Sequence, residues 1–417
     1  MKLLWISNIV LPKSAHLIGE KPIVFGGWIS QMIDQLSAID SVDINVVTKT
    51  SAVSKVQVHK HENVTYYFVP ESATNRYDAA ESDCQYILEH CNPDILHAEG
   101  TEQQFTYRML KLWKGQNSVS MQGIINGYEP YEYGLIPMEK LLFSANPWNW
   151  LFASVSILNK HFRFKPRLKF ERETIILAKN IFGRTLWDRA HSFAINSNAP
   201  YFHCRRTLRP AFYQEWDRNE IEDFSLFIGN ASNPRKGAHY VIEALQMLKT
   251  DFPKIKLCIA GLSPFPGSRW DIKKKIGYPN YLLRLIKKHK LLDRIEFTGI
   301  LTEREMADKL TKTKIFVMPS TIENSPNTLG EAMMLGVPTI SAFTGGIAQM
   351  GKDEDEILYY RDNDPAYLAY QIRRLFTDSE LYEKLSKQGR ARALLNHDKN
   401  TNLKDLMNGF TTINDSK

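Results

Sequence analysis

Short apolar runs alternate with amphipathic stretches along this chain, and the alternation predicts an α/β fold. Apolar or β-branched runs ended by polar turns predict strands at residues 2–7, 43–48, 64–69, 93–100, 119–123, 181–185, 193–196, 225–229, 256–260, 294–297, 315–318 and 337–341. Between them, apolar side chains recur at i, i+3, i+4 and i+7, as at Ile29, Met32, Ile33 and Leu36. Thr302 and Glu305 form a capping-box pattern that predicts the start of a further helix.

Residues 315–350 are ordered as strand, loop, helix, strand and glycine-rich loop. In an open parallel sheet such loops lie at the carboxyl ends of strands, where ligands bind. Pro326 suits the first turn of the helix, whose bare N–H groups suit a phosphate. Glu323 and Glu331 flank this turn with seven residues between them, and carboxylates accept hydrogen bonds from hydroxyls. The stretch therefore predicts a site for a phosphorylated, hydroxyl-rich ligand, although an ordinary βαβ unit with exposed glutamates has the same spacing.

Two other strand-to-helix turns carry candidate chemistry. Arg235 and Lys236 follow the strand at 225–229 and are placed to neutralise a diphosphate. The planar Arg235 guanidinium can bind two oxygens at once, and the Lys236 ammonium acts as a compact positive charge. A solvated basic helix start is the alternative. Gly26 and Gly27 precede the helix at 28–36, where glycine lets an anion or a sugar approach the backbone.

Composition limits the class of protein. A length of 417 residues predicts two or three domains, and 43% hydrophobic with 24% charged residues is ordinary for a soluble globular chain. The four cysteines are scattered, which favours a reducing compartment and argues against a zinc site. The start resembles a strand more than a signal peptide, and no run reaches the roughly 18 apolar residues of a membrane span. We expect a cytoplasmic protein. The net charge of +7 predicts an anionic partner: nucleic acid, anionic lipid or a sugar nucleotide.

Residues 138–170 differ from the rest of the chain. Aromatic and aliphatic side chains, including Phe143, Trp148 and Trp150, precede a basic run from Lys160 to Lys169 that holds no acid. This pattern is typical of a segment attracted to anionic lipid headgroups. Stacking aromatics with cations would also serve single-stranded nucleic acid, and a core-capping hairpin with a solvated basic face is the third interpretation.

Three motifs together resemble a known family. The run Glu323-Asn324-Ser325-Pro326 with Glu331-Ala332 resembles the E-x7-E motif of retaining GT-B glycosyltransferases of family 4. Lys236-Gly237 matches that family's basic loop, and residues 294–301 resemble its F-x-G turn. The resemblance implies two Rossmann-like, doubly wound α/β domains facing across a cleft. We expect an acceptor-side domain at 1–215 and a nucleotide-sugar domain at 222–395, with a final helix at about 399–412 packing back onto the first.

The resemblance also implies roles for residues. Arg235, Lys236 and the backbone at Asn327 and Thr328 would stabilise the leaving diphosphate, Glu331 would bind ribose, and Glu323 would act on the donor sugar. Ser325, Pro326, Gly229 and Ile300 would complete the donor site, and Gly26, Gly27, Glu99, Gln122 and Arg184 the acceptor side. The chain departs from the family at Asn230, where arginine is frequent, and at Glu99 and Gln122, where histidine is frequent. Gln122 can only hydrogen-bond.

The implied reaction transfers a sugar from a nucleotide diphosphate-sugar, UDP- or GDP-linked, to a hydroxyl with retention. The acceptor would be a sugar or a lipid-linked saccharide in cell-surface polysaccharide synthesis, with the protein peripheral on the inner face of the membrane. No metal or other cofactor is expected, since Arg235 and Lys236 would neutralise the phosphates and the D-x-D runs at 353–355 and 362–364 are typical of solvated loops. Nucleic acid is not expected as a partner. The alternatives are a nucleotide-sugar 2-epimerase, a phosphorylase, and a non-catalytic protein that binds anionic lipid or RNA.

Overall fold

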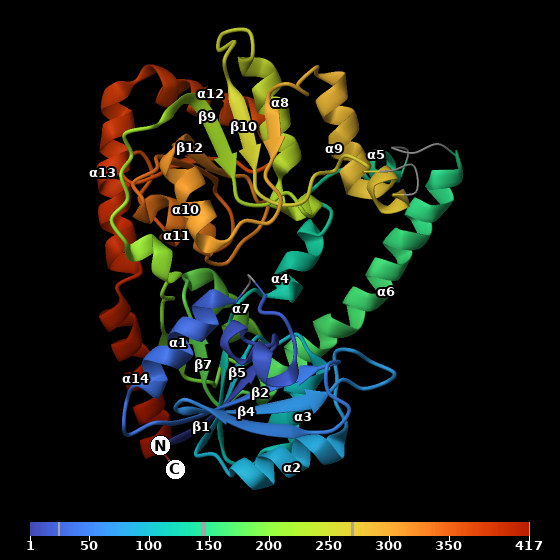
Figure 1. Ribbon diagram of the computed structural model, residues 1–417, viewed down its shortest axis with the longest axis vertical. Coiled ribbons are helices and arrows are strands. Elements are labelled where there is room, and N and C mark those ends of the chain that lie inside the picture. The colour runs from blue at the N-terminus through green and yellow to red at the C-terminus, as the bar shows by residue number, and fades with distance from the viewer. Residues whose placement is uncertain (24–25, 143–146, 268–270, 417) are drawn as a thin grey trace. The chain divides into compact units, whose positions relative to one another are not determined.

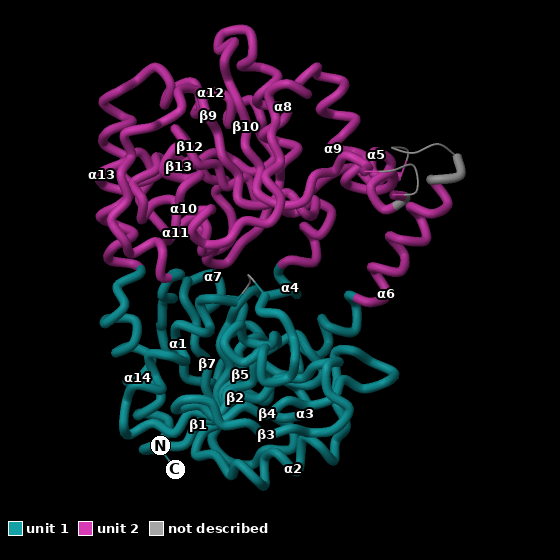
Figure 2. Tube along the Cα trace, in the orientation of Figure 1, with its two compact units in different colours: residues 1–127, 164–209, 397–417 teal, residues 128–163, 210–396 magenta. Residues whose placement is uncertain are grey.

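The computed structural model describes residues 1–23, 26–142, 147–267 and 271–416. They form two compact units (Figure 2): unit 1 comprises 1–127, 164–209 and 397–417, and unit 2 comprises 128–163 and 210–396. These ranges differ from the expected domains, because residues 128–163 group with the second half of the chain. Ile136 and Leu141 explain the difference, since both side chains are buried in the core of unit 2.

Unit 1 is built on an eight-stranded sheet in the order β3-β4-β2-β1-β5-β6-β7-β8. Its strands are β1 Lys2–Ser7, β2 Asp43–Thr50, β3 Gln57–His61, β4 Val64–Pro70, β5 Ile95–Glu99, β6 Gln116–Ser120, β7 Ile181–Gly183 and β8 Tyr201–His203. Only β3 runs antiparallel to its neighbour. The strand order reverses between β1 and β5, where Ser7 pairs with Glu99 at the carboxyl ends of the two strands. A doubly wound sheet binds ligands at this edge.

Helices cover both faces of this sheet, because its central strands are apolar on both sides. In β1, Leu4 and Ile6 pack into one cluster, whereas Leu3 and Trp5 pack into the other. The helices are α1 Gly27–Ser37, α2 Glu81–Cys91, α3 Gln104–Leu112, α7 Leu186–Ile195 and α14 Lys399–Asp415 (Figure 1), with a 3-10 helix η1 at Pro12–Ile18. Leu406, Phe410 and Ile413 of α14 lie in the same cluster as Leu3 and Trp5. The end of the chain thus completes the core of unit 1.

The expected strand at 193–196 is wrong, because these residues end α7. The Thr185 side chain accepts a hydrogen bond from the Asp188 N–H at 3.1 Å and so caps the start of this helix. Asn196 follows its end and donates through its side chain to the Ala178 carbonyl at 2.9 Å. The edge strand is instead β8, five residues further on.

Unit 2 has a six-stranded parallel sheet in the order β11-β10-β9-β12-β13-β14. Its strands are β9 Glu222–Ile228, β10 Lys256–Ile259, β11 Ile295–Phe297, β12 Thr313–Met318, β13 Thr339–Ala342 and β14 Leu358–Tyr360. Numbered within the unit, this is the Rossmann order 3-2-1-4-5-6. The two doubly wound units confirm the expected α/β fold class. The order reverses between β9 and β12, so the loops after these two strands border the binding edge.

Seven helices lie wholly within the described part of unit 2: α5 Met138–Leu142, α8 Ala238–Leu248, α9 Gly277–Lys288, α10 Glu303–Thr311, α11 Asn327–Met334, α12 Pro365–Thr377 and α13 Ser379–Asn396. Short 3-10 helices are η2 Glu129–Tyr131, η3 Pro210–Tyr213, η4 Pro234–Lys236, η5 Ile272–Lys275 and η6 Ile347–Gln349. Thr302 and Glu305 form the expected capping box of α10. The face of the sheet that carries Ile228 and Val317 packs with α8 and α12.

Two helices cross the division between the units, α4 Ile125–Tyr128 and α6 Pro147–Leu177. The described part of residues 138–170 lies in the helices α5 and α6. Phe143 lies outside the described residues, as does the side chain of Trp148. No helix in the described part of the chain is long and apolar enough to cross a membrane.

Candidate functional site

The amino end of α11 lies beside the end of β9, as the sequence predicted. A Cβ atom added to Gly229, the residue after β9, would lie 3.3 Å from the side chain of Thr328 in the first turn of α11. Pro326 stands immediately before the helix with an extended backbone (φ −73°, ψ 121°). Helix amino ends carry partial positive charge on N–H groups that lack intrahelical acceptors. This turn therefore offers N–H donors at the binding edge of the sheet.

The loops after β9 and β12 contact each other closely. The N–H of Thr321 donates to the carbonyl of Arg235 at 2.8 Å. Gly237 has φ +70°, and a Cβ atom there would lie 1.8 Å from the carbonyl oxygen of Pro319. Any other residue would meet both a strained backbone and a collision with backbone. Gly237 thus fixes the position of Lys236.

We expect Gly237→Ala to lower the Tm and to weaken donor binding together. The left-handed conformation and the collision should cost about 1–3 kcal/mol or more, because Pro319 can yield only by moving the β12 loop. Gly277→Ala is the matched control, since Gly277 has φ +59° with no atom near its Cβ position. Calorimetry and donor titration of both variants measure the difference. Equal losses in the two variants would show that the contact with Pro319 is unimportant.

Lys236 and Glu323 form an ion pair at this junction. Their side chains are 25% and 12% exposed, so the pair is reachable from solvent. The glycine loop after β13 holds Glu323 in place: its carbonyl accepts the Gly346 N–H at 2.9 Å, and a Cβ atom on Gly345 would lie 2.0 Å from the same oxygen. An ammonium and a carboxylate thus meet near the first turn of α11.

Arg235 points elsewhere. Its guanidinium lies 3.5 Å from the carboxylate of Glu132 and 4.6 Å from the centre of the Tyr128 ring. The Tyr128 hydroxyl in turn accepts the N–H of Asn324 at 3.1 Å. Tyr128, at the end of α4, thus packs against the loops that follow β9 and β12 in unit 2. Neither Tyr128 nor Glu132 carries a local signal for this role, because the contact joins segments about 100 residues apart.

The remaining expected donor residues differ in how far they are exposed. Glu331 is 1% exposed on the buried side of α11, and the Ser325 hydroxyl lies 3.5 Å from the sulfur of Met350. Ile300 is 54% exposed and follows Gly299, whose backbone pairs with Gly261 in the loop after β10. The expected contacts of Glu331 with ribose and of Ile300 with the base stay predictions.

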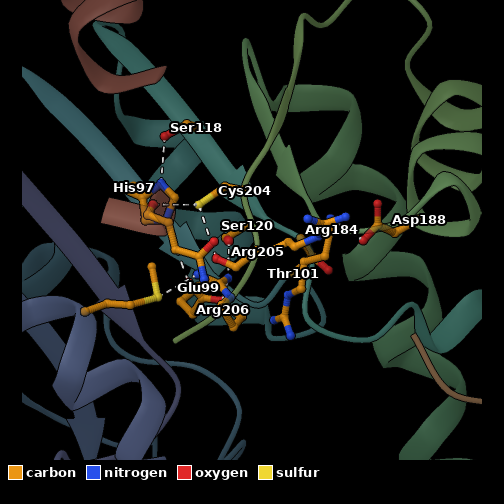
Figure 3. A network of polar contacts seen from close by, with 12 residues as sticks. His97, Glu99, Thr101, Ser118, Ser120, Arg184, Asp188, Cys204, Arg205 and Arg206 are labelled. Atoms are coloured by element: carbon orange, nitrogen blue, oxygen red, sulfur yellow. Dashed lines mark hydrogen bonds and ion pairs between the residues drawn. The ribbon is translucent and has the colours of Figure 1, made fainter. Parts of the chain in front are cut away.

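Unit 1 holds a polar cluster at the carboxyl ends of β5 and β6 (Figure 3). Arg206 forms an ion pair with Glu99 and also donates to the Ser120 hydroxyl. Both charged side chains are buried, Glu99 at 0% and Arg206 at 3% exposure. His97 bonds to the Ser118 hydroxyl at 2.8 Å, and its ring centre is 4.2 Å from that of Trp5. Glu99 was expected to meet sugar hydroxyls, but here its carboxylate is enclosed and meets arginine.

Burial and neighbouring charges determine the protonation states of Glu99 and His97 in this cluster. Burial by itself raises the pKa of the Glu99 carboxyl, but the charge of the Arg206 guanidinium and the nearby His97 ring, whose Nε2 lies 3.8 Å from the carboxylate, outweigh burial and lower it. Burial lowers the pKa of His97, which is therefore neutral at pH 7. The cluster is thus an arginine–carboxylate pair beside an uncharged imidazole.

The diglycine lies near this cluster. Gly26 caps α1 with φ +79°, and a Cβ atom on Gly27 would lie 3.3 Å from the Arg209 side chain. The guanidinium groups of Arg184 and Arg206 lie 5.4 and 4.8 Å from the centre of the Trp28 ring. Of the expected acceptor residues, Gly26, Gly27, Glu99 and Arg184 therefore share one region, and Gln122 is half-buried two residues beyond β6. Sequence reasoning missed Arg206, which follows β8 in a run that reads only as a domain junction.

Among the residues that the structure describes, no group of three or more His, Cys, Asp or Glu side chains is placed to hold a metal ion. Asp353 accepts the N–H of Tyr359 at 2.9 Å, and Asp364 caps α12. Both D-x-D runs thus supply structural hydrogen bonds.

Comparison with known proteins agrees with this architecture. Residues 209–392 match the family model described as glycosyl transferases group 1. A protein of Escherichia coli (strain K12) named as a colanic acid biosynthesis glycosyltransferase, WcaL, is 27% identical over 172 residues, which span 40% of this chain and 39% of that relative.

Two solved structures share the fold over the whole chain. Sucrose-phosphate synthase from Thermosynechococcus elongatus has a TM-score of 0.70 at 15% identity and covers 100% of both chains. Anabaena HepE in complex with UDP has a TM-score of 0.67 at 14% identity, over 99% of this chain and 100% of its own. HepE has also been solved with UDP-glucose. Residues 209–392 of this protein are therefore similar to the glycosyl transferases group 1 family, and the chain as a whole has the GT-B fold.

Proposed function

We propose that this protein transfers a sugar from a nucleotide diphosphate-sugar to a hydroxyl acceptor with retention at the anomeric carbon. The observation that carries the proposal is the Lys236–Glu323 pair beside the first turn of α11, at the switch point between β9 and β12. An ammonium and helix N–H groups favour an anion, and a carboxylate next to them accepts bonds from sugar hydroxyls. This combination suits a donor with a diphosphate on one side and a sugar on the other.

In the proposed reaction the bond between the anomeric carbon and the diphosphate breaks, and a bond from that carbon to the acceptor oxygen forms. The proton of the acceptor hydroxyl passes to an oxygen of the departing diphosphate, which leaves as an anion. Lys236 and the N–H groups at Asn327 and Thr328 would stabilise this developing charge. Arg235 would add to the positive potential from its place beside Glu132. Glu323 would hold donor hydroxyls, and Glu331 the ribose.

The complexes of HepE support UDP as the donor nucleotide, and GDP is the alternative. The name of WcaL supports a role in cell-surface polysaccharide synthesis, such as capsule, exopolysaccharide or lipopolysaccharide. The acceptor would then be a sugar or a lipid-linked saccharide, bound through the region of Gly26, Gly27 and Arg184. A cytoplasmic location, peripheral on the inner face of the membrane, would fit this role.

The test is a screen of UDP-, GDP-, ADP- and TDP-sugars by thermal shift, followed by NMR of the products of the stabilising donor. We expect one nucleotide class to raise the Tm and, with a saccharide acceptor, a new glycoside with the anomeric configuration of the donor. An epimerised free sugar nucleotide would instead identify a 2-epimerase. Absence of both binding and turnover with all four classes would overturn the proposal.

We further expect turnover to persist in EDTA. The positive charge opposite the diphosphate would come from Lys236, Arg235 and the α11 amino end, so a divalent cation is dispensable for charge neutralisation. Initial rates measured after dialysis against EDTA, with and without added Mg²⁺ or Mn²⁺, test this point. Loss of turnover that either ion restores would contradict it.

A further inference from the structure

Helix α6 carries a row of exposed apolar side chains in unit 2. Leu151, Val155, Leu158 and Phe162 follow one another at i, i+4, i+7 and i+11, which is one face of an α-helix. Their exposed fractions are 56%, 55%, 55% and 69%. We call these four residues the apolar face. A row of large apolar groups in water is uncommon in a stable fold and marks a site of interaction.

The opposite side of the same helix is anchored to unit 2. Ala153 is 1% exposed and Ile157 is half-buried. Lys160, which continues this inner side, pairs with Glu132 at 2.6 Å and lies 5.7 Å from the centre of the Tyr133 ring. The side of α6 with Ala153 and Ile157 is therefore the side that packs on unit 2. The apolar face is a second apolar side, and it points away from the core.

The positive charge of the residues around the apolar face indicates an anionic partner. Residues 147–170 hold five Lys or Arg residues and no Asp or Glu. Lys165 and Lys169 continue the spacing of the apolar face at i+14 and i+18, so the sequence places cations in register with it. Both residues are exposed; the Lys169 side chain is 72% exposed and lies 3.6 Å from the carboxylate of Glu173, an exposed contact that a lipid phosphate can replace. Apolar side chains followed by cations on one helical side suit insertion below a layer of anionic headgroups.

We propose that the apolar face of α6 docks onto an anionic lipid bilayer. Phe162 and its three aliphatic neighbours enter the level between headgroups and acyl chains, and Lys165 and Lys169 meet lipid phosphates. The docking needs no donor or acceptor, so it is independent of the proposed transfer reaction. A nucleic acid would use the cations but leave the aliphatic side chains exposed to water. A second copy of the chain would bring the same positive charges against themselves.

The test is flotation of the full chain with vesicles of phosphatidylcholine, with and without phosphatidylglycerol. We expect at least about tenfold more bound protein on the anionic vesicles, and a loss of binding in high salt. The double change Leu158→Ser and Phe162→Ser should reduce binding about tenfold, and Lys165→Gln with Lys169→Gln should remove the preference for anionic lipid.

Phe193→Ser is the matched control, because the side chain of Phe193 on α7 is 64% exposed and that of Phe162 is 69% exposed. It should leave flotation unchanged, and all variants should keep the wild-type Tm and the wild-type rate on soluble donor and acceptor. Equal binding to neutral and anionic vesicles, or no binding at all, would overturn the proposal. Two other results would also overturn the proposal. One is a dimer in solution that dissociates in the Leu158→Ser and Phe162→Ser variant. The other is an RNA complex that survives this change while vesicles do not bind.

Discussion

Replacing Lys236 by alanine should reduce kcat about 10²- to 10³-fold. The ammonium is ion-paired with Glu323, and in the proposed reaction it would act mainly on charge that develops as the diphosphate leaves. Loss of one such preorganised donor typically costs this factor in kcat. Steady-state kinetics with the donor found by thermal shift measure it, and KM should change less than kcat.

Lys314→Ala is a close control for this change. The Lys314 side chain is 26% exposed, nearly the same as Lys236, and lies 3.9 Å from Asp223 in the same unit. It should keep near wild-type kinetics. Arg235→Ala should have an intermediate effect, because its guanidinium is engaged by Glu132 and Tyr128. Wild-type turnover in Lys236→Ala would exclude this lysine from the site and remove the main support for the proposed function.

Replacing Arg206 by methionine should destabilise unit 1 by about 3–5 kcal/mol, because it leaves the buried Glu99 carboxylate without its partner. For a unit of this size the Tm should fall by about 6–20 °C. Combining it with Glu99→Leu should restore much of the loss, since an apolar pair often replaces a buried ion pair without penalty. Lys13→Met, which removes an exposed pair with Asp34, should cost less than about 1 kcal/mol.

The pH dependence of these variants should have opposite signs. In the wild type the pKa of Glu99 is lowered, so its contribution is present above the unfolded value of about 4.3 and is lost as the pH falls through the folded value. In Arg206→Met, burial raises the pKa of Glu99, so stability is lost as the pH rises above about 4.3. Unfolding measured between pH 3 and 6 would show the two slopes. Parallel curves would mean that Glu99 is not the group that titrates.

Local sequence signals predicted most of the fold. The Lys2–Ser7 strand and the Thr302–Glu305 capping box are set by neighbouring residues, and both are confirmed. The strand at Gln116–Ser120 was expected three residues later because its first residues are polar. Asn117 is nevertheless buried there, since its side chain accepts the N–H of Lys179 at 2.8 Å. Such a partner, 62 residues away, has no local signature.

The candidate site likewise has residues whose positions follow from local sequence and residues whose partners come from distant parts of the chain. Gly229, Gly237, Glu323 and Thr328 could be placed from the strand-loop-helix order alone, because their positions follow from the Rossmann winding. The partners of Arg235 and of Glu99 could not, because Tyr128, Glu132 and Arg206 reach them through tertiary packing. Burial of Glu99 in particular depends on Arg206 in the segment after β8. The sequence-based prediction placed the strand of this region at 193–196.

The contribution of α14 to unit 1 has a consequence for synthesis on the ribosome. Phe410 lies 6.2 Å from the ring of Trp5 and 5.1 Å from that of His97, so the core around β1 is completed by residues that are translated after unit 2. Unit 2 has all its strands before α14 is translated. The strands of unit 1 therefore leave the ribosome before unit 2 but complete their core after it, and until then the uncovered face needs protection from aggregation.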